Sequence, residues 1–210
     1  TWNLWEDRRG IHTFTCASVV AGLRAAANFA ELFAEHARAQ RYRERAESIV
    51  VAMERYLFDE QHGRYLRSLQ FNGDENFEPD ATVDTSLFGL FYFDCFSVTD
   101  PKVESTMRAI EEKLSVSSGG TARFENDGYM RVSELEPGNA WFICSLWLAE
   151  YYTARATTAS ELQKAHEIID WVVQKALPSG VLAEQADPVT GGPVSVAPLT
   201  WSHSTFVAAT

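Results

Sequence analysis

The 210-residue chain has few basic residues and no apolar segment long enough to cross a bilayer. Its 18 lysines and arginines stand against 29 aspartates and glutamates, which gives a formal net charge of −11. A surface of this sign repels a nucleic-acid backbone, so nucleic acid is not an expected partner. The longest apolar run, 141–149, is far shorter than the roughly 20 residues of a membrane span, and no charged-then-apolar leader opens the chain. No membrane partner is therefore predicted.

Cysteines are also scarce, and they show no ligand-like spacing with the five histidines. The three are Cys16, Cys95 and Cys144. An odd number of cysteines in apolar stretches predicts buried free thiols in a reducing cytoplasm. His12 and His203 have no partner at metal-binding spacing, and the acidic loop 72–80 lacks the ligand order of an EF-hand. Phosphate-cradling and nucleophile motifs are missing as well, so neither a metal nor a cofactor is predicted.

The chain does contain a regular alternation of two kinds of helical segment. At 46% hydrophobic and 12% aromatic residues, it can bury a sizeable core. Segments that are apolar on most sides alternate with segments that carry a single apolar stripe. The first kind covers 13–37, 82–96, 140–154 and a segment from about Leu199, and the second covers 41–57, 101–114 and 161–176. Buried helices thus alternate with surface helices.

Such alternation describes either two concentric rings of helices, an α/α toroid, or an open solenoid of helical hairpins. We favour the toroid and expect an all-α fold of about seven helices.

The long connections are expected to carry the function. The returns near 58–81, 115–139 and 177–198 are rich in glycine, proline and aspartate, and long loops in compact domains are usually functional. All of them, and the opening segment, enter buried helices at the N-terminal end, so they should gather at one face. Glu6 and Glu184 belong to that face, and two facing carboxyls are what glycosidic hydrolysis requires.

The same loops carry motifs that resemble the glucoamylase family of glycoside hydrolases, family 15, in its bacterial and archaeal branch. The motifs span the chain in family order. They are Leu4-Trp5-Glu6-Asp7-Arg8 followed by His12-Thr13-Phe14-Thr15, Ala122-Arg123-Phe124-Glu125-Asn126-Asp127, Gly138-Asn139-Ala140-Trp141-Phe142, Leu182-Ala183-Glu184-Gln185, and Leu199-Thr200-Trp201-Ser202-His203. The chain would correspond to the C-terminal half of the catalytic domain.

The resemblance implies an (α/α)6 toroid that removes α-linked glucose from a non-reducing end with inversion. It maps the general acid onto Glu6 and the general base onto Glu184. Six further residues map onto substrate-binding positions: Trp5, Asp7, Arg123, Asp127, Trp141 and Trp201. Family members have twelve toroid helices, so the resemblance implies that this chain is a partial ring of about seven. The whole chain, 1–210, would then be a single catalytic domain truncated on its N-terminal side. Family members need no cofactor for bond cleavage.

Several alternatives stay open at this stage. Glu6 can be a favourable charge at a helix start, Arg123 and Asp127 can be a structural ion pair, and Trp141 can belong to the core. Ala140 stands where family members usually have proline, and Asp7 where many have glutamate. These departures leave contacts on the leaving-group side undefined.

The expected partner is an α-glucan oligosaccharide or an α-linked disaccharide, with trehalase and glucodextranase specificities as alternatives to glucoamylase. A homo-oligomer is compatible with the sequence. The competing class is a truncated, non-catalytic helical scaffold whose open edge pairs with another chain.

Overall fold

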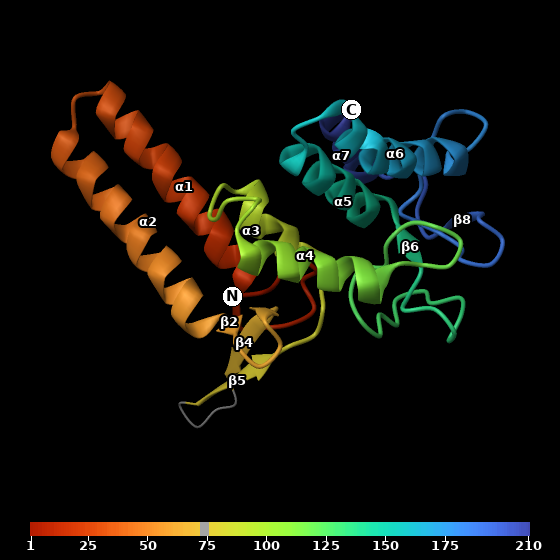
Figure 1. The fold of residues 1–210 in the computed structure, drawn as a ribbon, viewed down its shortest axis with the longest axis horizontal. Helices are drawn as coiled ribbons and strands as arrows, with labels where there is room; N and C mark the ends of the chain where they lie inside the picture. The colour runs from red at the N-terminus through yellow and green to blue at the C-terminus, as the bar shows by residue number, and fades with distance from the viewer. Residues whose placement is uncertain (72–75) are drawn as a thin grey trace. The chain divides into compact units, whose positions relative to one another are not determined.

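The computed structural model of the protein describes residues 1–71 and 76–210, and these divide into two compact units (Figure 1). The first unit contains Thr1–Thr82 and Ser86–Thr106, and the second contains Val83–Thr85 and Met107–Thr210. Whether the chain acts as one catalytic domain stays a prediction. Part of the acidic loop 72–80, namely 72–75, lies outside the described residues.

The first unit is built on an antiparallel hairpin of two long helices, α1 (Thr13–Leu32) and α2 (His36–Tyr56) (Figure 1). Small and medium side chains fill the buried positions of both helices. They are Ala17, Val20, Ala27 and Ala30 on α1 and Ala39, Ala46, Val50 and Met53 on α2. The single apolar stripe predicted for the second helix is confirmed, because α2 exposes its charged residues.

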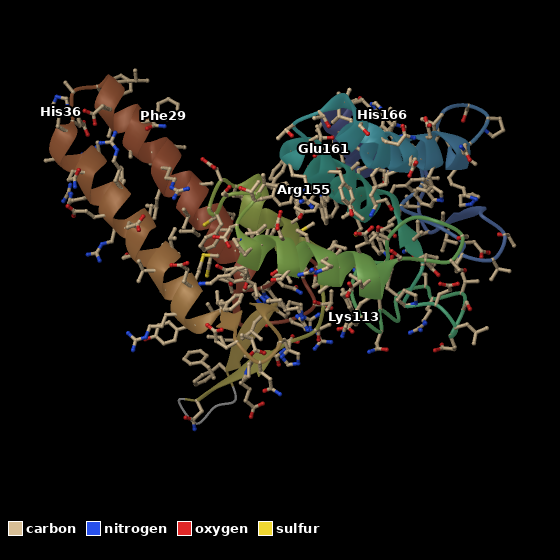
Figure 2. All side chains as sticks on the ribbon, viewed as in Figure 1. Phe29, His36, Lys113, Arg155, Glu161 and His166 are labelled. Carbon is tan, nitrogen blue, oxygen red and sulfur yellow. The ribbon has the colours of Figure 1, made fainter. Side chains whose placement is uncertain are left out.

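The prediction for the first helix is wrong in part. That segment was expected to be buried on most sides as far as residue 37, but α1 ends at Leu32, and Ala34 takes a left-handed conformation with φ of 57°. Phe29 and Leu32 are 65% and 81% exposed (Figure 2 labels Phe29). Within the described residues, α2 and α3 both contact α1, and apolar positions near its C-terminal end stay exposed.

Short strands replace the loop predicted for 58–81. The hairpin β2 (Phe58–Asp59) and β3 (Arg64–Tyr65) follows α2, and β4 (Ser68–Phe71) pairs with β1 (Ile11–His12) and with β5 (Phe77–Asp80). The start of α1 is fastened to the segment between β3 and β4. There the Thr13 hydroxyl donates to the Leu66 carbonyl at 2.6 Å, and the Thr13 N–H donates to the Arg67 carbonyl at 3.1 Å.

The predicted helix over 82–96 is also wrong in length. The segment forms a 3₁₀ turn (η1, Thr85–Phe88) and a single turn of α-helix (α3, Gly89–Tyr92), and then Asp94 takes a φ of 53°. By contrast, α4 (Pro101–Leu114) has the predicted bounds. Its residues through Thr106 belong to the first unit and those from Met107 to the second.

The second unit packs three helices together: α5 (Phe142–Arg155), α6 (Gln163–Lys175) and α7 (Thr200–Ala209) (Figure 1). A 3₁₀ turn, η2 (Ala159–Leu162), precedes α6. Every residue of α5 from Phe142 to Ala149 is buried, as predicted for a helix apolar on all sides. The stripe predicted for 161–176 is present on α6, whose Ala165 and Val172 are buried.

A three-stranded sheet joins the loops of the second unit at the start of α5. Its strands are β6 (Ala140–Trp141), β7 (Gln185–Ala186) and β8 (Pro193–Val194), all antiparallel. The register pairs Trp141 with Gln185. Two of the predicted motif segments therefore lie side by side.

The described residues contain no helix that is both long and apolar enough to span a membrane. All three cysteines are free, and Cys95 and Cys144 are buried. Burial raises the pKa of the Cys95 thiol to about 11 and raises that of Cys144 further. The two buried thiols are therefore held in the protonated, unreactive form.

Candidate functional site

In the first unit, the opening segment holds Glu6 at the tip of a tight turn. Trp2 pairs with Arg9 across the base of this turn. The Glu6 N–H donates to the Asn3 carbonyl at 3.1 Å, and Glu6 has a φ of 59°, in the left-handed region. Non-glycine residues with this conformation are uncommon and cluster at functional sites. The Glu6 side chain is exposed, and Trp5 beside it is half-buried.

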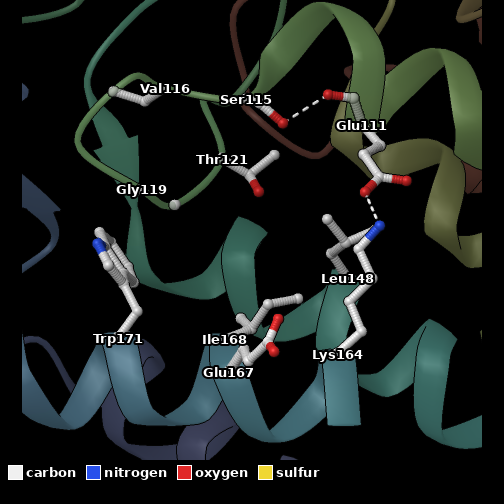
Figure 3. Close-up of a pocket in the computed structure, with 11 residues that line it drawn as sticks. Glu111, Ser115, Val116, Gly119, Thr121, Leu148, Lys164, Glu167, Ile168 and Trp171 are labelled. Atoms are coloured by element: carbon white, nitrogen blue, oxygen red, sulfur yellow. Dashed lines mark hydrogen bonds and ion pairs between the residues drawn. The ribbon is translucent and has the colours of Figure 1, made fainter. Parts of the chain in front are cut away.

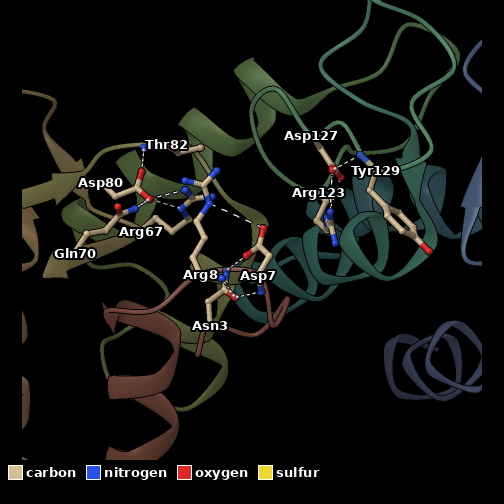
Figure 4. Close-up of polar contacts among 10 residues, drawn as sticks. All are labelled: Asn3, Asp7, Arg8, Arg67, Gln70, Asp80, Thr82, Arg123, Asp127 and Tyr129. Carbon is tan, nitrogen blue, oxygen red and sulfur yellow. Dashed lines mark hydrogen bonds and ion pairs between the residues drawn. The ribbon is translucent and has the colours of Figure 1, made fainter. Parts of the chain in front are cut away.

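The turn is stabilised from inside by Asn3, which is buried (Figure 4). Its side-chain oxygen accepts the Asp7 N–H at 3.1 Å, and its amide nitrogen donates to the Asp7 carboxylate at 2.6 Å. Asp7 is thus engaged in bracing the turn that presents Glu6. Its predicted contact with substrate stays a prediction.

A second polar cluster of the first unit surrounds Asp80, at the end of β5 (Figure 4). The guanidinium of Arg67 donates to Asp80 through Nε at 2.8 Å and also through Nη2, and Gln70 donates at 2.9 Å. The two charged side chains are only 2% and 8% exposed. Burial alone would raise the pKa of Asp80, but hydrogen bonds from Thr82 and Arg67 hold it below its usual value.

In the second unit, Arg123 and Asp127 form the direct ion pair weighed above as a structural alternative (Figure 4). Arg123 donates through Nε and Nη2 to the two carboxylate oxygens, both at 2.8 Å. The Tyr129 N–H also donates to Asp127, at 3.0 Å. The side chain of Asp127 is 2% exposed and that of Arg123 is 11% exposed.

Aromatic rings surround this guanidinium. It lies 4.7 Å from the ring centre of Trp141, 4.6 Å from that of Phe124 and 5.5 Å from that of Tyr129. Cation–π contacts of this kind strengthen when water is excluded. The Arg123 guanidinium is therefore held by hydrogen bonds at its edge and by aromatic rings over its faces. A group that positions a ligand must be fixed in this way.

Glu184 precedes β7 and is tied to the backbone on both sides. Its N–H donates to the Val196 carbonyl at 2.9 Å, and its carbonyl accepts the Phe142 N–H at 3.3 Å, at the start of α5. Its half-buried carboxylate accepts a hydrogen bond from the side-chain amide of Gln185 at 3.1 Å.

Gln185 is completely buried and is held in turn by Asn139. The Asn139 amide nitrogen donates to the Gln185 amide oxygen at 2.7 Å, and its own oxygen accepts the Val132 N–H at 3.0 Å. This chain fixes which end of the Gln185 amide faces Glu184. Both residues stood within the quoted motifs, but no role was predicted for either.

The predicted aromatic residues differ in environment. Trp141 is 3% exposed and lies 6.0 Å from the Tyr129 ring, so it is mainly a wall of the Arg123 cluster. Trp201 on α7 is 37% exposed and meets Trp147 edge-on at 5.8 Å. As expected of a histidine at a helix start, His203 binds backbone: its Nε2 accepts the Leu182 N–H at 3.1 Å.

The predicted residues therefore form two groups. Glu6, Trp5 and Asp7 belong to the first unit, while the second unit contains Glu184, Arg123, Asp127, Trp141 and Trp201. The pairing of β6 with β7 brings the Glu184 network next to the Arg123 cluster. That Glu6 and Glu184 face one another stays a prediction. The described residues contain no cluster of three or more histidine, cysteine or acidic side chains suited to a metal ion.

The fold itself is that of known glucoamylases. A bacterial glucoamylase in complex with acarbose superimposes with a TM-score of 0.80, at 25% identity, over 98% of this chain and 34% of its own. A glucoamylase from Saccharomycopsis fibuligera superimposes with a TM-score of 0.77, at 15% identity, over 99% and 56%. The all-α, α/α toroid class is thereby confirmed.

The sequence comparisons agree with the fold. Residues 2–174 match the family described as glycosyl hydrolases family 15, and the chain belongs to that family. It is 28% identical to an uncharacterized glycosyl hydrolase of Methanocaldococcus jannaschii, over 98% of this chain, and 26% identical to a glucoamylase of Clostridium sp. (strain G0005), over 97%. The chain spans about one third of the length of these two relatives, 33% and 32%.

Proposed function

We propose that the chain is the part of a glucoamylase-like glycoside hydrolase that supplies both catalytic carboxyls. In this proposal, the enzyme releases glucose from the non-reducing ends of α-linked glucans with inversion. Glu6 is the general acid that protonates the glycosidic oxygen. Glu184 is the general base that activates a water on the opposite face of the sugar. Family membership and the likeness to a glucoamylase complexed with acarbose support this substrate class.

The observation that carries the proposal is the amide chain behind Glu184. A loop carboxylate with no function would be solvated freely. Instead, the carboxylate of Glu184 is oriented by Gln185, and Asn139 fixes that amide in place. A base that must hold one water needs this kind of fixed orientation.

Sugar binding is assigned to the neighbouring groups of the second unit. Arg123 is held in one orientation by its two bonds to Asp127, and charged donors suit ring hydroxyls. Trp201, which is more exposed than Trp141, offers an apolar face to the C–H side of glucose. Trp5 and Asp7 are proposed to serve the same sugar from the turn of Glu6.

The test is proton NMR of maltotetraose, isomaltose and trehalose incubated with the chain. We expect β-glucose to appear first from one of these substrates, which identifies both inversion and linkage. Glu6→Gln and Glu184→Gln should each lower the rate by about 10²–10⁴. Glu112→Gln, an exposed position on α4, is the matched control.

Two results would contradict the proposal. Initial release of α-glucose would exclude inversion, and full activity of the Glu184→Gln variant would remove the assigned base. If the chain cleaves none of the three substrates, the result favours the non-catalytic scaffold. Trehalase and glucodextranase specificities would then be unsupported as well.

A further inference from the structure

A cavity of about 320 Å³ lies in the second unit, between the C-terminal end of α4, the loop 115–121 and α6 (Figure 3). None of the residues assigned above to catalysis or substrate binding lines it. Its size falls at the lower end of the range for small-molecule sites, roughly 300–1,000 Å³. It is therefore a separate feature of the molecule.

The lining combines an apolar floor with polar groups at its edges. Leu148 and Ile168 form the floor in Figure 3, and Trp171 stands at one end. Glu111 and Lys164 stand at the other end, where they form an ion pair with each other. The single ammonium group is thus already neutralised, which disfavours an anionic ligand.

The aromatic end of the cavity is rigid. Trp171 donates its indole N–H to the Ser118 carbonyl at 3.1 Å, and the loop passes directly against the ring at Gly119 and Gly120. These two glycines have φ of 90° and 81°, and a Cβ at either would come within 2.5 Å of the indole. The cavity is consequently preformed, because neither the ring nor the loop can collapse into it.

The hydroxyl of one mostly buried residue points into the cavity. Thr121 is 3% exposed, and its hydroxyl is directed into the space above Ile168 and Leu148 (Figure 3). Its backbone is fully used, because its N–H donates to the Ser145 hydroxyl and its carbonyl accepts the Trp141 N–H, both at 2.9 Å. The hydroxyl thus faces the cavity itself, where a ligand that carries a matching polar group can reach it.

The exposed side of the cavity continues into a second hollow. Lys164 and Glu167 line both this cavity and a neighbouring one of about 450 Å³. The neighbour is bordered by Tyr152, Arg155 and Glu161 (Figure 2 labels the last two). Carboxylates, a guanidinium and the Tyr152 ring, contributed by α5, η2 and the N-terminal half of α6, therefore border this second hollow.

We propose that this cavity is a second carbohydrate-binding site, which takes one neutral pyranose unit of a glucan chain. The apolar floor and Trp171 would contact the C–H face of the sugar. The Thr121 hydroxyl and the Glu167 carboxylate would bind its hydroxyls, and the next sugar unit would extend over Lys164 toward Arg155. The choice of an α-glucan rests on the proposed function, but the preference for a neutral, hydroxyl-rich ligand rests on the cavity alone.

The test is a titration of the ¹⁵N-labelled chain with maltotetraose, followed by proton–nitrogen NMR. The Glu184→Gln background prevents turnover during the titration. We expect saturable shifts of the Gly119 and Gly120 amides and of the Trp171 indole, separate from those of the Trp141 indole. In this background, Thr121→Val combined with Glu167→Gln should weaken binding at the three cavity reporters by about tenfold, equivalent to the loss of one or two hydrogen bonds.

Two controls keep the result specific. Glu167→Gln alone changes only an exposed carboxylate, so its partial effect on affinity is free of any folding defect. Cellotetraose, the β-linked isomer, tests whether the site discriminates linkage. Unshifted Gly119, Gly120 and Trp171 signals up to tens of millimolar maltotetraose would overturn the proposal, as would equal affinity in the double substitution. Hydrolysis of maltotetraose by the unsubstituted chain reports the proposed function independently of these shifts.

Discussion

Replacing Gln185 by glutamate is expected to make the stability of the chain depend on pH in a way that replacement by leucine does not. The Gln185 amide nitrogen lies 3.1 Å from the Glu184 carboxylate, and Gln185 is fully buried. Gln185→Glu has nearly the same shape, and it keeps the oxygen that accepts the hydrogen bond from Asn139. Only the atom facing Glu184 changes, from an N–H to a carboxyl oxygen.

At low pH the introduced carboxyl holds a proton and can still donate to Glu184, so the free energy of unfolding should stay close to that of the unsubstituted chain. At higher pH two negative charges about 3 Å apart would repel by on the order of 5 kcal/mol at an effective dielectric constant of 20. Glu184 is only half-buried, and water reduces this repulsion to an expected loss of about 2–3 kcal/mol.

The direction follows from proton binding. The folded pair retains one proton that the unfolded chain has released, so stability is fully present below pH ~4 and is lost as the pH rises through the folded titration of the pair. Gln185→Leu instead removes both hydrogen bonds at every pH, at a cost of about 1–3 kcal/mol.

The assay is urea unfolding of the three proteins between pH 4.5 and 8, followed by circular dichroism. The unsubstituted chain corrects for other groups that titrate in this range. If the difference between Gln185→Glu and the unsubstituted chain does not change with pH, the Gln185–Glu184 hydrogen bond does not exist in solution. The argument for an oriented base would then fail with it.

Three further outcomes are expected. Arg123→Lys keeps the charge but loses one of two bonds to its carboxylate partner, so unfolding free energy should fall by about 1–3 kcal/mol in a urea titration; an unchanged midpoint would contradict this. Burial raises the pKa of Glu150 to about 7, which means that stability is lost as the pH rises toward that value. Glu150→Gln should therefore raise the free energy of unfolding at pH 8, by up to about 3 kcal/mol, and leave it unchanged at pH 4. Equal effects at both pH values in urea titrations would count against a buried carboxyl. Gly120→Ala should destabilise the chain by about 1–3 kcal/mol more than Gly180→Ala, because both have φ of 81° but only the first meets the Trp171 ring; equal melting temperatures would disprove that contact.

The amphipathic helices were the most predictable part of the fold. Helix α4 has the predicted bounds because its start is signalled locally: Asp100 accepts the Lys102 N–H at 2.8 Å, and Pro101 occupies the first helical position. Its apolar stripe is also easy to recognise, because charged residues occupy the opposite face of the helix. Where local signals and periodicity agree, little is left for tertiary contacts to decide.

The apolar segments were less predictable. The segment 82–96 is nearly all apolar, and a buried run of this kind has no periodicity that separates a helix from shorter elements. Asp94 ends α3 with a φ of 53°, and Ala34 follows α1 with a φ of 57°. Neither residue is a typical helix C-terminal signal, as glycine is, so both helices were predicted too long.

The candidate site likewise has residues that the sequence predicts and residues that it does not. Its charged members were found through motifs, but Gln185 and Asn139 act through a pairing that sequence patterns do not reveal. Strands β6 and β7 have two residues each, too few for an alternating pattern. The amide chain behind Glu184 exists only because that pairing places Asn139 within 2.7 Å of Gln185.

Trp141 links the two halves of the site in the second unit. It is the last residue of β6 and the residue that precedes the first turn of α5. Its ring lies beneath the Arg123 guanidinium, and its backbone pairs with Gln185. A shift in the start of α5 would thus move Arg123, the proposed sugar-binding residue, together with the residue that orients the proposed base. This coupling explains why the short strand β6 lies at the start of the buried helix α5. The strand keeps Arg123 and Gln185 in fixed positions relative to each other, and the helix holds the strand in place.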